Sequence, residues 1–184
     1  MNKLFIAGCA GFVGALTSVI YMYLWQWQID LSIEAYGGSV ILMAVAALAS
    51  VVYWYGLSIV GTRYQSSTLH YMAFLALVLS VVTDASGAFY TLAPQYAASS
   101  GWEALGLLMG TLYGLAYILA GLAVQKLRQQ FGDVALWYGI LAMVSGIIML
   151  AGDFGIPLVS TLGMVLNAVL YVLGGMILLQ AAKR

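Results

Sequence analysis

Residues 116–129 read AYILAGLAVQKLRQ, an apolar run that ends at Lys126 and Arg128. A second apolar run begins at Val134, so the two basic residues stand in a short connection between two apolar segments. About 20 mostly apolar residues are enough for a helix to cross the hydrocarbon core of a bilayer. The stretch therefore predicts two membrane-spanning helices joined by a short basic loop.

The composition of the whole chain supports the same class. Of 184 residues, 64% are hydrophobic and 7% are charged, whereas a soluble domain carries roughly a quarter charged residues. So few charges cannot cover a surface that faces water, and we expect an integral membrane protein whose surroundings are the lipid bilayer. The formal net charge is zero and no basic run is present, which argues against nucleic acid as a partner.

Six segments have the length and apolar character of transmembrane helices. We expect a single all-α domain, residues 1–184, built as a polytopic bundle of six transmembrane helices. The expected spans are about 4–25, 38–61, 69–93, 102–125, 134–152 and 157–181.

The basic residues predict the orientation of the bundle. With six spans, every basic residue falls on one side of the membrane: Lys3, Arg63, Lys126, Arg128, Lys183 and Arg184. Lysine and arginine favour the cytoplasmic side of a membrane. We therefore expect both termini to be cytoplasmic, in a plasma or inner membrane.

One carboxylate lies well inside a predicted span. In the stretch VVTDASGAFY, residues 81–90, Asp84 lies about nine residues, or roughly 13 Å, from the outer end of its helix. Hydrogen-bonding side chains fall near the same depth on other helices and complete a predicted ligand or ion pathway: Asp84, Asn167, Tyr113, Thr111, Thr17, Ser18 and Ser145.

Two interpretations of this polar layer are open. An ionised carboxylate at membrane depth costs several kcal/mol unless it is paired or hydrated, and no lysine or arginine lies within a span. Asp84 could therefore face a wet cavity, a bound cation or hydrogen-bond donors. Alternatively, a protonated Asp84 could bond to Tyr113 or Asn167 as a packing contact, and the serine and threonine hydroxyls could bond back to their own helices.

Small residues recur at helical spacing on two of the predicted helices. Such residues let helix backbones approach one another in lipid, and they can face the core of the bundle or a partner. The candidates for contact with a membrane-protein partner or a second copy of the chain are Ala7, Gly11, Ala15, Gly106, Gly110 and Gly114.

The sequence lacks the groups that most enzymes need. It contains no phosphate-binding loop, nucleophile elbow or HExxH motif. The single Cys9 and the single His70 exclude a disulfide and a metal or haem site built from several such ligands within the chain. We expect no catalytic residue, no metal and no cofactor, and we do not expect an enzyme.

Two classes of function remain. The first is a channel or transporter for an ion or a small solute, with an outward-facing polar site around Asp84. The second is a non-catalytic membrane subunit of a larger complex. In size, six helices, cytoplasmic termini and the Ala7–Gly11–Ala15 spacing, the chain resembles the substrate-binding components of energy-coupling vitamin transporters. That resemblance implies a solute-binding subunit.

Overall fold

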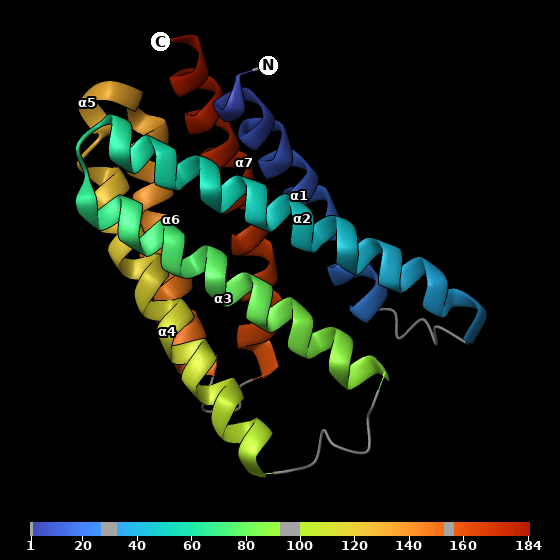
Figure 1. Cartoon of the computed structure of the whole chain (residues 1–184). Helices are drawn as coiled ribbons and strands as arrows, with labels where there is room; N and C mark the ends of the chain where they lie inside the picture. Colours follow the sequence, from blue (N-terminus) through green and yellow to red (C-terminus); the bar gives the residue numbers. More distant parts are fainter. Residues whose placement is uncertain (1, 27–32, 93–99, 153–156) are drawn as a thin grey trace.

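The computed structural model describes residues 2–26, 33–92, 100–152 and 157–184, and all its regular elements are helices (Figure 1). The elements are α1 (Lys3–Gln26), α2 (Ile33–Arg63), α3 (Ser67–Leu92), α4 (Ser100–Gln125), α5 (Arg128–Phe131), α6 (Asp133–Gly152) and α7 (Pro157–Lys183). Within these ranges, six helices are long and apolar enough to cross a membrane. The predicted number of spans is therefore confirmed.

The helix boundaries agree with the predicted spans at most ends. α2 differs because it begins at Ile33, before residue 38, where the second span was predicted to start. The four-residue helix α5 was not predicted, and it occupies the basic connection after α4. At the start of α3 the hydroxyl of Ser66 accepts a hydrogen bond from the Leu69 N–H at 3.4 Å, which is the geometry of a helix cap.

The six long helices form a closed ring in chain order. Each packs against the helix before it and the helix after it, and α7 packs against α1. α2 also contacts α7 across the ring. Both termini and α5 lie at one end of the bundle (Figure 1), which we call the terminal end; the other end is called the opposite end.

Hydrogen bonds join three helices at the terminal end. The side-chain amide of Asn2 donates to the carbonyl of Ala182 at 2.8 Å. The guanidinium of Arg63 donates to the carbonyl of Ala181 at 2.9 Å. These bonds satisfy carbonyl groups in the last turn of α7, which have no partner within their own helix.

Glycines allow two pairs of helices to approach closely. At Gly11, an added Cβ would lie 2.7 Å from the Tyr171 carbonyl oxygen and 3.0 Å from the Gly175 Cα of α7. At Gly121, an added Cβ would lie 2.7 Å from the Gly139 carbonyl oxygen, which joins α4 to α6. Backbone contacts of this kind are typical of helices packed in lipid.

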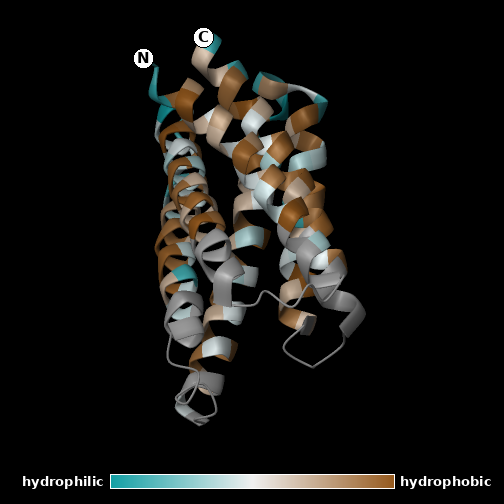
Figure 2. Ribbon diagram, turned by 90° about the vertical axis from the view of Figure 1, so that its right-hand side faces the viewer, coloured by the Kyte–Doolittle hydropathy of each residue, from teal (hydrophilic) through white to brown (hydrophobic). Residues whose placement is uncertain are grey.

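Hydrophobic residues make up most of the coloured parts of the long helices (Figure 2), and many large apolar side chains are exposed on the outside of the bundle. Ile41, Leu48 and Leu16 are each more than 60% exposed. A contiguous apolar surface of this size would aggregate in water, whereas hydrocarbon chains accept it. The fold is therefore that of a multi-pass membrane protein.

Candidate functional site

A cavity of about 620 Å³ lies inside the ring of helices. Its lining residues come from all six long helices, most of them from the half nearer the opposite end, whereas Ser50, Tyr117 and Tyr171 lie nearer the terminal end of their helices. The residues that line it are Gly14, Thr17, Ser18, Ala46, Ser50, Ser80, Thr83, Asp84, Ser86, Leu105, Gly106, Met109, Gly110, Tyr113, Tyr117, Met149, Asn167 and Tyr171.

Aromatic side chains close the cavity on the side of the terminal end. Tyr53, Trp54 and Tyr138 are each no more than 2% exposed. The Tyr53 hydroxyl donates to the Leu170 carbonyl at 3.2 Å and lies 3.3 Å from the Tyr138 hydroxyl. The ring of Tyr53 packs directly on Gly174, where the missing side chain leaves room for it. We call Tyr53, Trp54 and Tyr138 the aromatic floor.

Trp54 joins the aromatic floor to the cavity wall. Its ring meets that of Tyr117 edge to face, with the centroids 5.2 Å apart. Its indole nitrogen is buried near the Tyr113 hydroxyl, but it makes no hydrogen bond of good geometry to any described residue. A buried N–H without a partner is costly, and a polar group close to this donor is the Tyr113 hydroxyl of the cavity wall.

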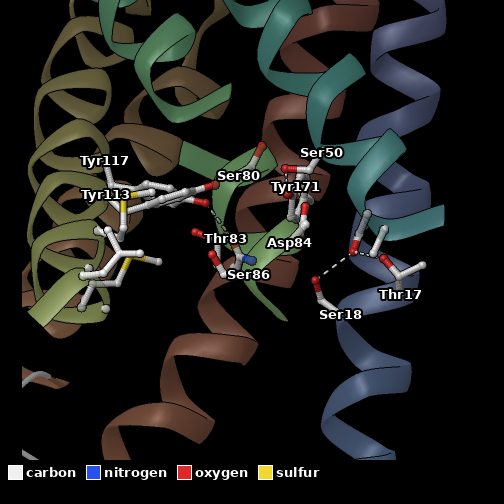
Figure 3. Close-up of a pocket in the computed structure, with 18 residues that line it drawn as sticks. Thr17, Ser18, Ser50, Ser80, Thr83, Asp84, Ser86, Tyr113, Tyr117 and Tyr171 are labelled. Carbon is white, nitrogen blue, oxygen red and sulfur yellow. Dashed lines mark hydrogen bonds between the residues drawn. The ribbon is translucent and has the colours of Figure 1, made fainter. Parts of the chain in front are cut away.

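Asp84 lies on the cavity wall formed by α3. Figure 3 shows it between the tyrosines of α4 on one side and Thr17 and Ser18 of α1 on the other. α3 continues to Leu92, so the carboxylate is within the helix and not at its end. Among the described residues, Asp84 has no hydrogen-bond or ion-pair partner. The predicted packing bonds to Tyr113 and Asn167 are therefore not formed in the structure.

Asn167 is bonded to a different residue of the wall. The Tyr117 hydroxyl donates to Asn167 Oδ1 at 2.8 Å and links α4 to α7. On the neighbouring turn of α7, the Tyr171 hydroxyl donates to Ser50 Oγ at 2.9 Å and links α7 to α2. These two bonds hold the side chains of three helices around the cavity (Figure 3).

The small hydroxyls of the wall bond to their own helices. Thr17 and Ser18 both donate to the Gly14 carbonyl, at 2.9 and 2.8 Å. Ser80 donates to the Leu77 carbonyl at 2.9 Å, and Ser86 donates to the Val82 carbonyl at 2.7 Å. The predicted back-bonding is confirmed, and it leaves the oxygen lone pairs of these side chains free to face the cavity.

The structure brings together most of the residues that the sequence placed in a polar layer. Asp84, Asn167, Tyr113, Thr17 and Ser18 line the cavity. Thr111 does not, because it lies on an exposed face of α4. Ser145 does not either, because it is fully buried in the packing of α6, where its hydroxyl has no hydrogen-bond partner among the described residues.

Sequence reasoning missed two tyrosines of the wall. Tyr117 follows Tyr113 by four residues, and Tyr171 follows Asn167 by four residues. Side chains four apart lie on the same face of a helix, so this spacing could have identified both.

The predicted partner-binding stripes contribute to contacts within the chain. Ala7, Gly11 and Ala15 are buried in the bundle, and a Cβ at Gly114 would meet the Gly146 carbonyl oxygen of α6. Gly106 and Gly110 line the cavity. Contact between these faces and a partner stays a prediction.

No cluster of three or more histidine, cysteine or acidic residues suited to a metal ion occurs in the described parts of the chain. No protein-family model, curated protein or solved structure matches the chain.

Proposed function

We propose that the chain moves a small solute or an ion across a membrane, with Asp84 in the binding site. The observation that supports this is a cavity that all six spanning helices build around Asp84, a carboxylate without a hydrogen-bond or ion-pair partner among the described residues. An ionised carboxylate at membrane depth costs several kcal/mol unless it is paired or hydrated. Helix packing does not offset that free-energy cost, whereas binding of a solute or an ion can offset it.

The distribution of basic residues indicates which side of the membrane the site faces. The basic residues Lys3, Arg63 and Lys126, together with the C-terminal pair Lys183 and Arg184, belong to the terminal end. By the positive-inside rule, the terminal end faces the cytoplasm. We propose that the cavity is open on the side away from the cytoplasm.

The closed floor favours a carrier over an open channel. Tyr53, Trp54 and Tyr138 fill the ring between the cavity and the terminal end. We propose that a solute enters from the opposite end, because these buried side chains stand between the cavity and the terminal end. Release on the other side requires the helices to move, as in transporters that alternate access around a fixed site.

Thiol labelling tests the sidedness. Cys9 is the only cysteine, so Cys9→Ser gives a background without thiols. In sealed vesicles, we expect Ser18→Cys to react with a membrane-impermeant thiol reagent added on the side opposite the termini. Thr62→Cys, an exposed position at the terminal end, is the matched control and should react only from the other side. Reaction of Ser18→Cys from the side of the termini would contradict the proposed access.

Flux in proteoliposomes tests the transport itself. We expect concentration-driven uptake of at least one probe among sodium, potassium, methylammonium and glucose, and at least a roughly tenfold loss in Asp84→Asn. Asp133→Asn, an exposed carboxylate outside the cavity, is the control. Unchanged flux in Asp84→Asn would show that the role given to Asp84 is wrong.

The closed floor also suits a second candidate, the solute-binding subunit of a larger transporter, because a partner could then drive the release. Purification from native membranes tests it. Other subunits should copurify in constant ratio, whereas a monomer or homo-oligomer without other chains would contradict it.

A further inference from the structure

The charge of the cavity restricts what it can bind. Among the described residues that line it, Asp84 is the only acidic one, and no lysine, arginine or histidine is present. An ionised Asp84 therefore gives the cavity a net negative charge, and its low-dielectric walls strengthen the field of that charge. An anion would be repelled, and a cation would be attracted.

The hydrogen bonds of the wall point in the same direction. The hydroxyls of Thr17, Ser18, Ser80 and Ser86 donate to carbonyls of their own helices. Those oxygens can offer a ligand only lone pairs while these bonds persist. A wall that carries free acceptors beside a carboxylate matches a ligand that carries N–H donors or a positive charge.

Aromatic rings supply a second kind of contact for a cation. The rings of Tyr113 and Tyr117 lie 5.3 Å apart at an interplanar angle of 35°, and Figure 3 shows both across the cavity from Asp84. Tyr171 adds a third ring from α7. The face of an aromatic ring attracts a cation, most strongly where water is excluded.

The size of the cavity separates an organic cation from a metal ion. About 620 Å³ is within the range of small-molecule sites, roughly 300–1,000 Å³. Calcium takes six to eight oxygen ligands at about 2.3–2.6 Å, several of them carboxylates. In the described residues Asp84 is the single carboxylate on this wall, and Met109, Met149 and Leu105 make much of the remainder apolar.

We propose that the cavity binds a small organic cation, a protonated amine or a quaternary ammonium, with Asp84 as the counter-charge and Tyr113, Tyr117 and Tyr171 around the cationic group. This inference rests on the proposed transport function, because it names the class of solute for the same site. The Asn167 amide, which already accepts from Tyr117, keeps its N–H groups for a polar substituent of the ligand.

A matched set of probes tests the inference. Choline is compared with 3,3-dimethyl-1-butanol, which has the same shape but a carbon in place of the charged nitrogen. Benzyltrimethylammonium, benzoate and sodium chloride complete the set. Binding is measured by titration calorimetry on the full chain in nanodiscs of zwitterionic lipid, so that the lipid itself adds no net charge.

We expect choline or benzyltrimethylammonium to bind, and the neutral alcohol and benzoate to bind at least tenfold more weakly. Loss of a hydrogen bond or a contact to a charged group typically lowers affinity by roughly tenfold to a hundredfold. Asp84→Asn should weaken cation binding by a similar factor. Asp84→Glu keeps the charge and should retain most of the affinity, and Asp133→Asn should behave as the unmodified chain. The Asp84→Glu variant also shows that a loss in Asp84→Asn comes from charge and not from misfolding.

Three results would overturn the inference: equal binding of choline and its neutral isostere, unchanged cation binding in Asp84→Asn, or no binding of either cation at millimolar concentration. The proposed transport function fails separately. Asp84-dependent flux of sodium or glucose without cation binding would keep the transport function and remove the organic cation. Asp84-dependent cation binding without flux of the bound cation would keep this site and remove the transport function.

Discussion

The terminal half and the opposite half of the bundle differ in what fills the space between the same six helices. In the terminal half, Tyr53, Trp54 and Leu57 are buried almost completely, and Tyr53 of α2 packs on Gly174 of α7 across the ring. In the opposite half, a cavity of about 620 Å³ takes that place, and its wall carries Asp84.

The difference shows how one helix bundle can combine a stable core with a binding site. Large aromatic side chains in one half supply the buried contacts that hold the ring closed. Small side chains in the other half, such as Gly106, Gly110 and Ser80, leave the interior open. The following changes test whether the two halves have these separate roles.

The largest effect is expected from Trp54→Ala in the terminal half. The indole is 1% exposed, and removal of a buried tryptophan side chain typically costs about 3–5 kcal/mol. We expect a loss of that size in the free energy of unfolding, measured by denaturant titration in detergent. Because Trp54 is part of the aromatic floor, the variant should also let the impermeant thiol reagent reach Ser18→Cys from the terminal end.

The matched control is Met109→Ala, which shortens a partly exposed side chain of the cavity wall. It should cost far less than Trp54→Ala. Equal losses from the two substitutions would show that the terminal half is not the more strongly packed one.

An intermediate effect is expected from Gly11→Ala. The added Cβ would stand 2.7 Å from the Tyr171 carbonyl oxygen, and backbone cannot yield as a flexible side chain does. Overpacking of this kind costs about 1–3 kcal/mol, and it should lower the midpoint of thermal unfolding in detergent.

Gly106→Ala makes the same chemical change on the cavity side, where an added Cβ meets nothing within 4 Å. The greater helix propensity of alanine should leave stability unchanged or slightly raised. A comparable loss at both glycines would contradict the contrast between a packed half and a hollow half.

The smallest effect, and one of opposite sign, is expected from Asp84→Asn. The carboxylate has no hydrogen-bond or ion-pair partner among the described residues, so its removal takes away an unfavourable charge. We expect the free energy of unfolding to rise by about 1 kcal/mol. A fully desolvated charge would cost several kcal/mol, but the cavity has room for water, which lowers the cost.

Asp133→Asn provides the comparison, because Asp133 pairs with Arg128 at 2.8 Å on an exposed surface. Loss of such a pair typically lowers stability by less than about 1 kcal/mol. If Asp84→Asn lowered stability more than Asp133→Asn, Asp84 would be a structural residue and the cavity would lose its main support as a binding site.

The sequence predicted the spans well because hydrophobic length is a local property. Each run of apolar residues has to be about as long as the bilayer is thick, so α6 at Asp133–Gly152 and α7 at Pro157–Lys183 could be recognised without knowledge of their neighbours. The depth of Asp84 in the membrane, obtained by counting residues along α3, stays a prediction.

Rotation about each helix axis could not be predicted so well. Thr111 and Tyr113 lie two residues apart at similar depth, yet Tyr113 lines the cavity and Thr111 lies on an exposed face. Two residues correspond to about 200° around a helix with 3.6 residues per turn, so equal depth carries no information on direction. For the same reason Ser145 was placed in the polar layer, although packing of α6 against α4 buries it.

The sequence alone therefore determined the number of helices, their lengths and the end of the bundle at which the basic residues gather, because the bilayer selects these properties one segment at a time. The tertiary structure decided which residues meet. The close approach of Gly11 to α7 and the filling of the terminal half by Tyr53 and Trp54 set the rotation of the helices. That rotation turns Asp84, Tyr113, Tyr117 and Tyr171 toward one cavity, because side-chain direction depends on contacts between helices that are distant in the sequence.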